Sequence, residues 1–198
     1  MKLVVTEYSV KVVLVYVDDL LITGNNQHLI DDTRKTLHNK SEKGVLLNQR
    51  KYTLELLKLG GAKPASTPMK TNAKLTTVEY DSIVRNNDNP ELTDISSYQQ
   101  LVEKLIYLTI TRPYICFAVQ VLSQFMQHSK RSHWDVVLRV LTYLKKTLGQ
   151  GVLLMKGPIT SLTTYCDLDW ATCPSTRRPV TGYVIQLGDS LISWKSKK

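Results

Sequence analysis

The feature that most constrains the fold is a change in the spacing of apolar residues near Gly149. Between Tyr98 and Leu144 apolar side chains recur every three or four positions, which predicts amphipathic helices. After Gly149 the period becomes two, which predicts strands at residues 151–155, 161–166, 180–187 and 190–194, all in one sheet. The chain is therefore expected to have an α+β fold.

Three helices are expected in the central block. The first carries Tyr98, Leu101, Val102 and Leu105 on one face. The second begins near Pro113, is apolar nearly all round through Met126, and should be central. The third begins at Ser132, with Asp135 as its capping-box partner, and its apolar stripe consists of Trp134, Val137, Leu138, Leu141 and Leu144.

The first third of the chain combines short strands and helices. Residues 12–16 and 20–23 are apolar runs that predict a hairpin with acids at its tip. A helix over 27–38, a strand over 44–48 and a helix over 50–59 follow. Residues 63–94 are mostly polar and predict a loop followed by a linker.

Composition and charge indicate a globular chain with a polyanionic partner. Hydrophobic residues make up 42% and charged residues 22%, and the net charge is +9. An ordinary basic soluble domain is the alternative. The three cysteines lack metal-ligand spacing, and the apolar stretch 11–22 is interrupted by acids and too short to cross a bilayer. We expect an intracellular protein of the cytoplasm or nucleus that is neither secreted nor bound to a membrane.

The most specific motif is Tyr16-Val17-Asp18-Asp19 between two apolar strands. Adjacent carboxylates repel each other, and a divalent cation relieves the repulsion. Two Mg²⁺ ions about 4 Å apart can activate an attacking hydroxyl and stabilise a leaving phosphate oxygen. A solvated Asp-Asp turn is the alternative for these four residues alone.

The surrounding sequence resembles the reverse transcriptase and ribonuclease H region of copia-type retrotransposon Pol polyproteins. The segment 14–24 is similar to the palm hairpin of that family, and Gln49-Arg50-Lys51-Tyr52 with 64–68 to the segment after the palm. Residues 107–113 and 132–134 resemble its connection helices. Residues 165–171, Tyr-Cys-Asp-Leu-Asp-Trp-Ala, with 181–183 resemble the opening of its ribonuclease H domain.

The resemblance implies four regions. Residues 1–69 would be part of the palm with the segment after it, 70–95 a polar linker, 96–150 the connection helices, and 151–198 the first strands of a ribonuclease H-like sheet. The implied activity is RNA-directed DNA polymerisation followed by hydrolysis of the RNA strand, with RNA, DNA or an RNA–DNA hybrid as partner and Mg²⁺ as cofactor.

The resemblance also implies roles for individual residues. Asp18 and Asp19 would be catalytic ligands of Mg²⁺, and Tyr16 would lie near the primer terminus. Asp167 would be the first metal-binding aspartate of ribonuclease H. Asp169 could share its face if the strand extends that far, although an exposed turn acid is the preferred interpretation. Arg177 and Arg178 could touch a phosphate backbone or form a solvated loop tip.

The sequence departs from the family pattern in ways that predict an inactive fragment. The family has a third palm aspartate on an earlier strand, whereas residues 1–11 offer only Glu7. Residues 39–43 join segments that the family separates by further palm strands, which indicates an internal deletion. Ribonuclease H needs further carboxylates beyond the third strand. Glu103 and Tyr114 replace the usual glycine and aspartate.

Two other functions remain open. The chain could be an enzyme half that another subunit completes, or a domesticated, non-enzymatic module that binds nucleic acid. Because the last strands expose an apolar face and an open edge, self-association through unpaired strand edges is also expected.

Overall fold

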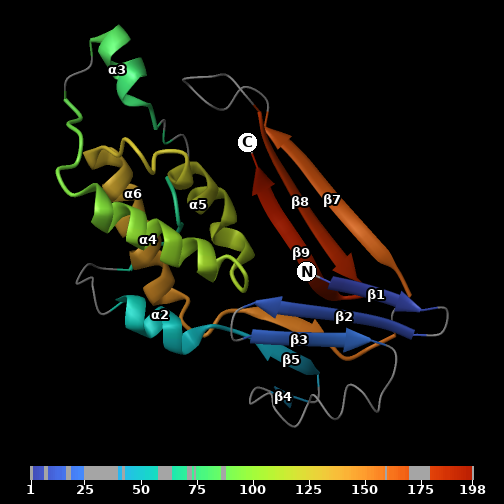
Figure 1. Cartoon of the computed structure of the whole chain (residues 1–198). Coiled ribbons are helices and arrows are strands. Elements are labelled where there is room, and N and C mark those ends of the chain that lie inside the picture. Colours follow the sequence, from blue (N-terminus) through green and yellow to red (C-terminus); the bar gives the residue numbers. More distant parts are fainter. Residues whose placement is uncertain are drawn as a thin grey trace.

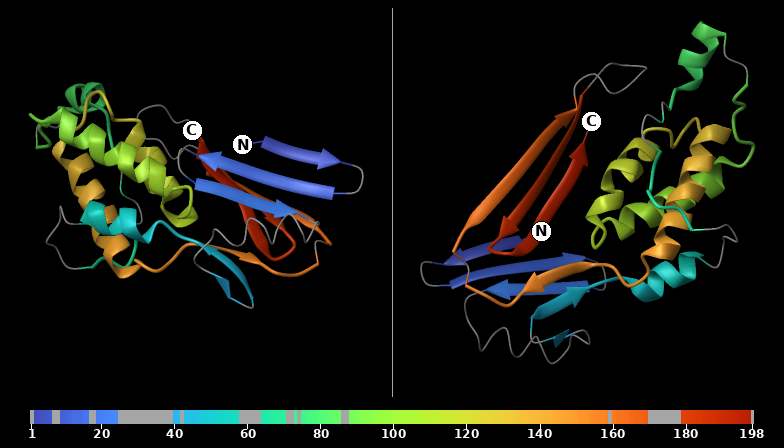
Figure 2. Two further views of the ribbon diagram at one scale, coloured as in Figure 1. Left: turned by 60° about the horizontal axis from the view of Figure 1, so that its bottom comes forward. Right: turned by 180° about the vertical axis from the view of Figure 1, so that it is seen from behind.

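The computed structural model describes residues 2–6, 9–16, 19–24, 40–41, 43–57, 64–70, 73, 75–85, 88–158, 160–169 and 179–197. In the strands before residue 42, and at Asp169, it describes the backbone alone. The helices gather on one side and the strands on the other in all three views (Figures 1 and 2). The fold is α+β, as predicted.

The helices are α2 (Arg50–Leu57), α3 (Val78–Val84), α4 (Ile95–Leu108), α5 (Cys116–Ser123) and α6 (Arg131–Lys146), with a 3₁₀ turn η1 (Pro113–Ile115) before α5. The strands are β1 (Lys2–Thr6), β2 (Ser9–Tyr16), β3 (Asp19–Gly24), β4 (Lys40–Ser41), β5 (Gly44–Leu47), β6 (Val152–Met155), β7 (Leu162–Asp169), β8 (Val180–Leu187) and β9 (Ser190–Lys197). None of these helices combines the length and the apolar character needed to cross a bilayer.

The hydrophobic core lies between α4, α5 and α6. In α4 the Asp94 side chain caps the helix by accepting a hydrogen bond from the Ser97 N–H at 3.0 Å. Its buried face repeats every three or four residues and meets α5 and α6. The buried hydrophobic residues of these three helices are Tyr98, Leu101, Val102, Leu105, Leu108, Ala118, Val119, Leu122, Val137, Val140, Leu141 and Leu144.

Two of the predicted helices differ in detail. Helix α5 ends at Ser123 rather than near Met126, and Phe117 is 40% exposed, so one face of this helix is not covered. Helix α6 begins at Arg131 after Lys130, so the expected cap by Ser132 with Asp135 is wrong. His133 fills that capping role instead, because its Nδ1 accepts a hydrogen bond from the Lys130 N–H at 3.0 Å. The buried stripe of α6 accordingly includes His133 and Val140, while Trp134 and Leu138 are only partly buried.

The strands form three antiparallel sheets with the orders β1-β2-β3, β4-β5-β6 and β7-β8-β9. The prediction that residues 151–155 share a sheet with the later strands is wrong, because β6 pairs with β5. A pairing between strands more than a hundred residues apart leaves no periodic signal in either strand. Strands β7, β8 and β9 form the predicted sheet, with a β-bulge between Ile185 and Gln186.

The segment expected to be a loop and linker contains helix α3. The Thr77 hydroxyl oxygen caps this helix by accepting a hydrogen bond from the Tyr80 N–H at 3.2 Å. The helix is seven residues long and projects from the end of the helical block (Figure 1). The helix predicted over 27–38 lies outside the described residues.

Two glycines allow β5 and β6 to come together. A Cβ atom on Gly44 would collide with the carbonyl oxygen of Leu154, and one on Gly151 with that of Leu47. Both obstacles are backbone atoms of the opposite strand, so they cannot move aside without breaking the pairing. Gly44 also has a φ of 155°, a conformation that residues with a side chain rarely adopt.

We predict that Gly151→Ala lowers the free energy of unfolding by about 1–3 kcal/mol, because the new methyl group forces the strands apart. Urea unfolding measures the loss, and hydrogen exchange at the Lys156 amide, which donates to the Lys43 carbonyl at 2.8 Å, reports on the pairing. Gly157→Ala is the matched control, since a Cβ there meets nothing within 4 Å. Equal stability of the two variants would contradict the strand pairing.

Candidate functional site

The two apolar strands predicted around the Tyr-Val-Asp-Asp segment are present as β2 and β3, and they pair with each other. Strands β2 and β3 are antiparallel, and their last pair before the turn joins Tyr16 to Asp19. Val17 and Asp18, which follow Tyr16 in the sequence, fall outside the described residues.

Strand β1 runs antiparallel to β2, with Lys2 opposite Val13 and Thr6 opposite Ser9. This strand was not anticipated from the sequence. Its residues are Lys-Leu-Val-Val-Thr, so the strand beside the hairpin contributes no carboxylate.

The third predicted metal ligand, Asp167, lies in β7 opposite Gly182. It is exposed, and its Oδ1 accepts a hydrogen bond from the Leu168 N–H at 2.9 Å. The strand continues to Asp169, opposite Val180, rather than ending at Cys166 as predicted. The backbone thus meets the condition for positions 167 and 169 to share a face. Arg177 and Arg178 lie outside the described residues.

The carboxylates do not form a complete metal site within the part of the chain that the structure describes. There, no three residues among His, Cys, Asp and Glu come together as a metal-binding group. The predicted ligand Asp18 lies outside the described residues, so the magnesium site that the sequence implies stays a prediction.

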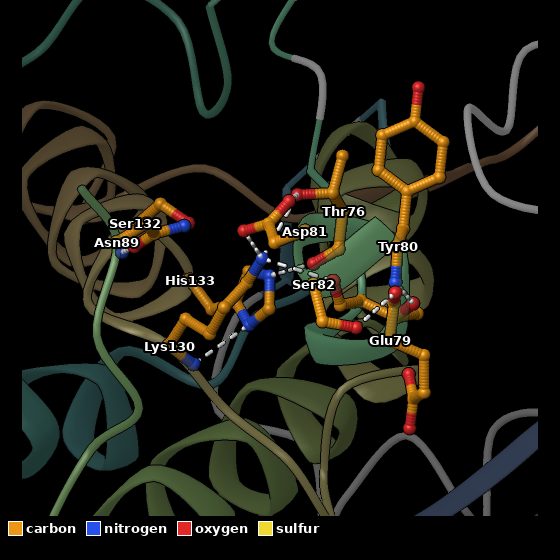
Figure 3. A network of polar contacts seen from close by, with 10 residues as sticks. Thr76, Glu79, Tyr80, Asp81, Ser82, Asn89, Lys130, Ser132 and His133 are labelled. Carbon is orange, nitrogen blue, oxygen red and sulfur yellow. Dashed lines mark hydrogen bonds and ion pairs between the residues drawn. The ribbon is translucent and has the colours of Figure 1, made fainter. Parts of the chain in front are cut away.

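A buried polar network joins α3 to the start of α6 (Figure 3). The Lys130 ammonium forms an ion pair with the Asp81 carboxylate and also donates to the Thr76 hydroxyl at 2.9 Å. The Thr76 hydroxyl in turn donates to Asp81 Oδ1 at 2.6 Å. Lys130 is 1% and Asp81 6% exposed, so each charge depends on the other for compensation. Burial opposes ionisation of Asp81, but the hydrogen bonds from Lys130 and Thr76 outweigh it and lower the pKa of this carboxyl.

His133 completes the network as a neutral ring. Its Nδ1 accepts from the Lys130 N–H, so Nε2 carries the proton and donates to the Thr76 carbonyl at 3.2 Å. The ring also stacks on Phe125, with centroids 3.9 Å apart. Burial, together with the nearby Lys130 charge, lowers the pKa of His133 to about 4. The side chain is enclosed and acts as a cap and a spacer rather than as a base.

Arg112, in the Thr-Arg-Pro segment, is fully buried and holds the end of α6. Its guanidinium donates to the carbonyl oxygens of Thr147 and Leu148, the latter at 3.0 Å, and to the Tyr114 hydroxyl at 3.0 Å. Carbonyl groups at a helix C-terminus carry partial negative charge, which favours a cation there. The role of this arginine is to fix the turn after α6.

Trp194 attaches the last sheet to the helical block. Its indole N–H donates to the Thr109 carbonyl at 2.7 Å, at the end of α4. Cys116, which is partly buried, lies beside the same carbonyl, and burial raises the pKa of its thiol to about 11. The contact holds β9 against α5 and so positions the sheet that carries Asp167.

Sequence reasoning missed Asp81, Lys130, Thr76 and Trp194 as structural partners. One signal was present for α3, because Thr77 precedes Val78 and Glu79 in the manner of a helix cap. Lys130 stands in a polar run between Ser129 and Arg131, where a lysine is ordinarily solvated. Its pairing with Asp81, 49 positions earlier, has no local signature.

The relatives of the chain are transposon polyproteins. It is 37% identical to the retrovirus-related Pol polyprotein from transposon RE2 of Arabidopsis thaliana, over 212 positions that include 96% of this chain. The polyprotein from transposon RE1 of the same plant is 36% identical over 212 positions, again with 96% of the chain. The chain spans 14% of the length of each of these polyproteins.

A shorter relative has nearly the same extent. An uncharacterized mitochondrial protein of Arabidopsis thaliana is 33% identical over 209 positions, which include 93% of this chain and 82% of that protein. No protein-family model and no solved structure matches the chain. These similarities define the class as retrovirus-related Pol polyproteins of transposons. Within that class, the chain belongs to the copia-type family.

The matched regions contain more positions than this chain has residues, which is 198. The relatives therefore carry residues inside the matched region that this chain lacks. This is consistent with an internal deletion, which the sequence placed at residues 39–43.

We predict that Asp81→Ala lowers the free energy of unfolding by about 3–5 kcal/mol, because it leaves the Lys130 ammonium buried without a counter-charge. The double variant Asp81→Leu, Lys130→Met should recover most of this loss, as measured by urea unfolding. The control is Asp135→Ala, which removes an exposed ion pair with Arg131 and should cost less than about 1 kcal/mol. A loss at Asp81 no larger than at Asp135 would refute the buried pair.

We predict that stability falls as the pH drops from about 6.5 to about 4, by up to about 3 kcal/mol from His133. In this interval His133 binds a proton in the unfolded chain but not in the folded one, so protons favour unfolding. His133→Gln keeps an acceptor for the Lys130 N–H and should flatten the pH dependence, whereas His128→Gln, at an exposed position, should not. Unfolding midpoints across this range test the assignment, and parallel curves for wild type and His133→Gln would count against it.

Proposed function

We propose that this chain is the part of a retrotransposon Pol polyprotein that contains the Tyr-Val-Asp-Asp hairpin of an RNA-directed DNA polymerase and the opening sheet of its ribonuclease H. The observation that carries the proposal is the hairpin itself. Two findings support the proposal: Tyr16 pairs with Asp19 across β2 and β3, and the chain is related to transposon Pol polyproteins over nearly its whole length.

In this proposal Asp18 and Asp19 are ligands of catalytic Mg²⁺, and Asp167 belongs to the separate ribonuclease H centre. When bound, the metal would activate a primer hydroxyl and stabilise phosphate charge. Tyr16, directly opposite Asp19 in the hairpin, would lie beside the primer terminus.

We further propose that the 198-residue polypeptide by itself does not extend a primer. Catalysis by two metals calls for carboxylates from more than one strand, and β1, the strand beside the hairpin, has none. The existence of a relative of nearly the same extent, named as a separate mitochondrial protein, makes a stand-alone binding module the second candidate.

Both candidates bind nucleic acid, because the net charge of +9 favours a polyanion. Two lysines, Lys43 and Lys156, lie next to each other at one end of the paired strands β5 and β6. Lys43 and Lys156 are both exposed, and the hydrogen bond between their backbones places them side by side. Two adjacent ammonium groups on strand ends can contact neighbouring phosphates.

The test is primer extension with Mg²⁺ on an RNA template, with the chain alone and with Asp18→Asn. We expect no incorporation by either, while fluorescence anisotropy detects binding to an RNA–DNA hybrid that weakens as salt rises. Nucleotide incorporation that disappears in Asp18→Asn would overturn the proposal of inactivity. Binding that does not respond to salt would overturn the electrostatic role.

The contribution of Lys43 and Lys156 to binding can be measured separately. Lys43→Ala, Lys156→Ala should reduce the slope of log affinity against log salt by about 2, because each lysine that contacts a phosphate contributes about one released counterion. Lys104→Ala, an exposed lysine in the middle of α4, is the control.

A further inference from the structure

Strand β7 is an exposed edge of its sheet. It pairs with β8 on one side, and no other described strand pairs with it. Leu162 is 66%, Tyr165 59% and Leu168 52% exposed, so large apolar groups stand uncovered on both faces of the strand. Figures 1 and 2 show β7 as the strand of this sheet farthest from the helices.

Strand β7 lacks most of the devices that usually protect an edge, although it carries two charged residues, Asp167 and Asp169. Natural edge strands carry lysines, prolines or bulges, or are covered by another element. The sequence of β7 is Leu-Thr-Thr-Tyr-Cys-Asp-Leu-Asp, and the bulge of this sheet lies on its other side, between Ile185 and Gln186. Along this eight-residue strand, alternate residues thus direct their backbone N–H and C=O groups away from β8, where a further strand can bind them.

Symmetry restricts how two such edges can pair. If two copies of β7 pair into one continuous antiparallel sheet, a two-fold axis perpendicular to that sheet relates them. This axis keeps each side chain on its own face of the sheet, so each residue can pair only with a residue of the same face in the other copy. Three registers near the middle of the strand satisfy this condition. In each of them one residue, Thr164, Tyr165 or Cys166, lies opposite the same residue of the second copy.

Only the register centred on Tyr165 matches the side chains. On one face of the sheet, Leu162 of each copy lies opposite Leu168 of the other, which gives two leucine pairs. On the other face, Tyr165 lies opposite Tyr165 of the second copy. Thr163 then faces Asp167, so a hydroxyl can donate to the carboxylate. The two Asp167 residues stand four positions apart, about 13 Å, which exceeds the screening length of about 8 Å in physiological salt. The register centred on Cys166 instead sets Tyr165 opposite Asp167, and the one centred on Thr164 sets Thr163 opposite Tyr165.

We infer that β7 is a self-association surface, and that two copies of this chain pair their β7 strands antiparallel with Tyr165 at the two-fold axis. Charge favours this occupant over nucleic acid, because the ionisable side chains of β7 other than tyrosine and cysteine are aspartates, which repel phosphates. A pair of eight-residue edges buries less than the roughly 1,200 Å² of a standard interface, so the dimer is weak and depends on concentration. The inference does not depend on the proposed function.

Sedimentation velocity of the full 198-residue chain, over a roughly hundredfold range of protein concentration, tests the inference. The wild type should shift from monomer to dimer. Tyr165→Lys should remain monomeric, because it places two ammonium groups opposite each other at the axis. Ile83→Lys, which replaces a side chain 80% exposed on α3, is the matched control and should dimerise as the wild type does.

Disulfide trapping tests the register of the two β7 strands. All variants carry Cys173→Ser, which removes another cysteine that could form disulfides. Thr164→Cys should form a covalent dimer on mild oxidation, because position 164 faces the natural Cys166 of the other copy. Thr164→Cys, Cys166→Ser should not form one. A disulfide-linked dimer of the Cys173→Ser protein through Cys166 would show a different register. A disulfide-linked dimer of Thr164→Cys, Cys166→Ser through position 164 would also show a different register. A monomer at every concentration, or equal loss of dimer in Tyr165→Lys and Ile83→Lys, would overturn the inference.

Discussion

The packing of α4 against α5 and α6 is the interaction on which the rest of the structure depends. Their apolar faces bury a continuous set of side chains, and the Tyr98 hydroxyl adds a buried hydrogen bond to the Leu122 carbonyl at 2.8 Å. Burial of this kind is the main favourable term in folding. Helix α2 adds Leu56 to this core, and several other elements are attached to these helices through polar contacts.

Three such attachments organise the periphery. The Asp81–Lys130 pair ties α3 to the start of α6, and the Trp194 indole ties β9 to the end of α4. Gln49, just before α2, is buried between Tyr107 and Thr111, with the Thr111 hydroxyl donating to its Oε1 at 2.8 Å. Each contact satisfies a backbone or side-chain group that would otherwise be buried without a partner, which makes these contacts specific in position.

The segments that carry the candidate chemistry lie away from this core. The hairpin at residues 16–19 belongs to the β1-β2-β3 sheet, and Asp167 stands exposed on the edge of the last sheet. The residues with the most shifted pKa values, such as His133, are instead enclosed in the helical block. Among the described residues, the largest pKa shifts arise from burial in the fold.

Local sequence determined the elements of this protein. The three helices of the core, the Tyr-Val-Asp-Asp hairpin and strand β8 followed from apolar period, turn residues and β-branched runs, because these signals act between near neighbours. The α+β class followed in the same way.

Tertiary structure alone decided which distant segments meet. Strand β6 joined β5 rather than the last sheet, Lys130 turned inward to Asp81, and His133 replaced Ser132 and Asp135 in capping α6. In each case the energy comes from a partner far along the chain: a complementary strand edge, a buried counter-charge, or the Thr76 carbonyl. No local pattern encodes such a partner, since strand pairing and ion pairing depend on where the chain returns in space.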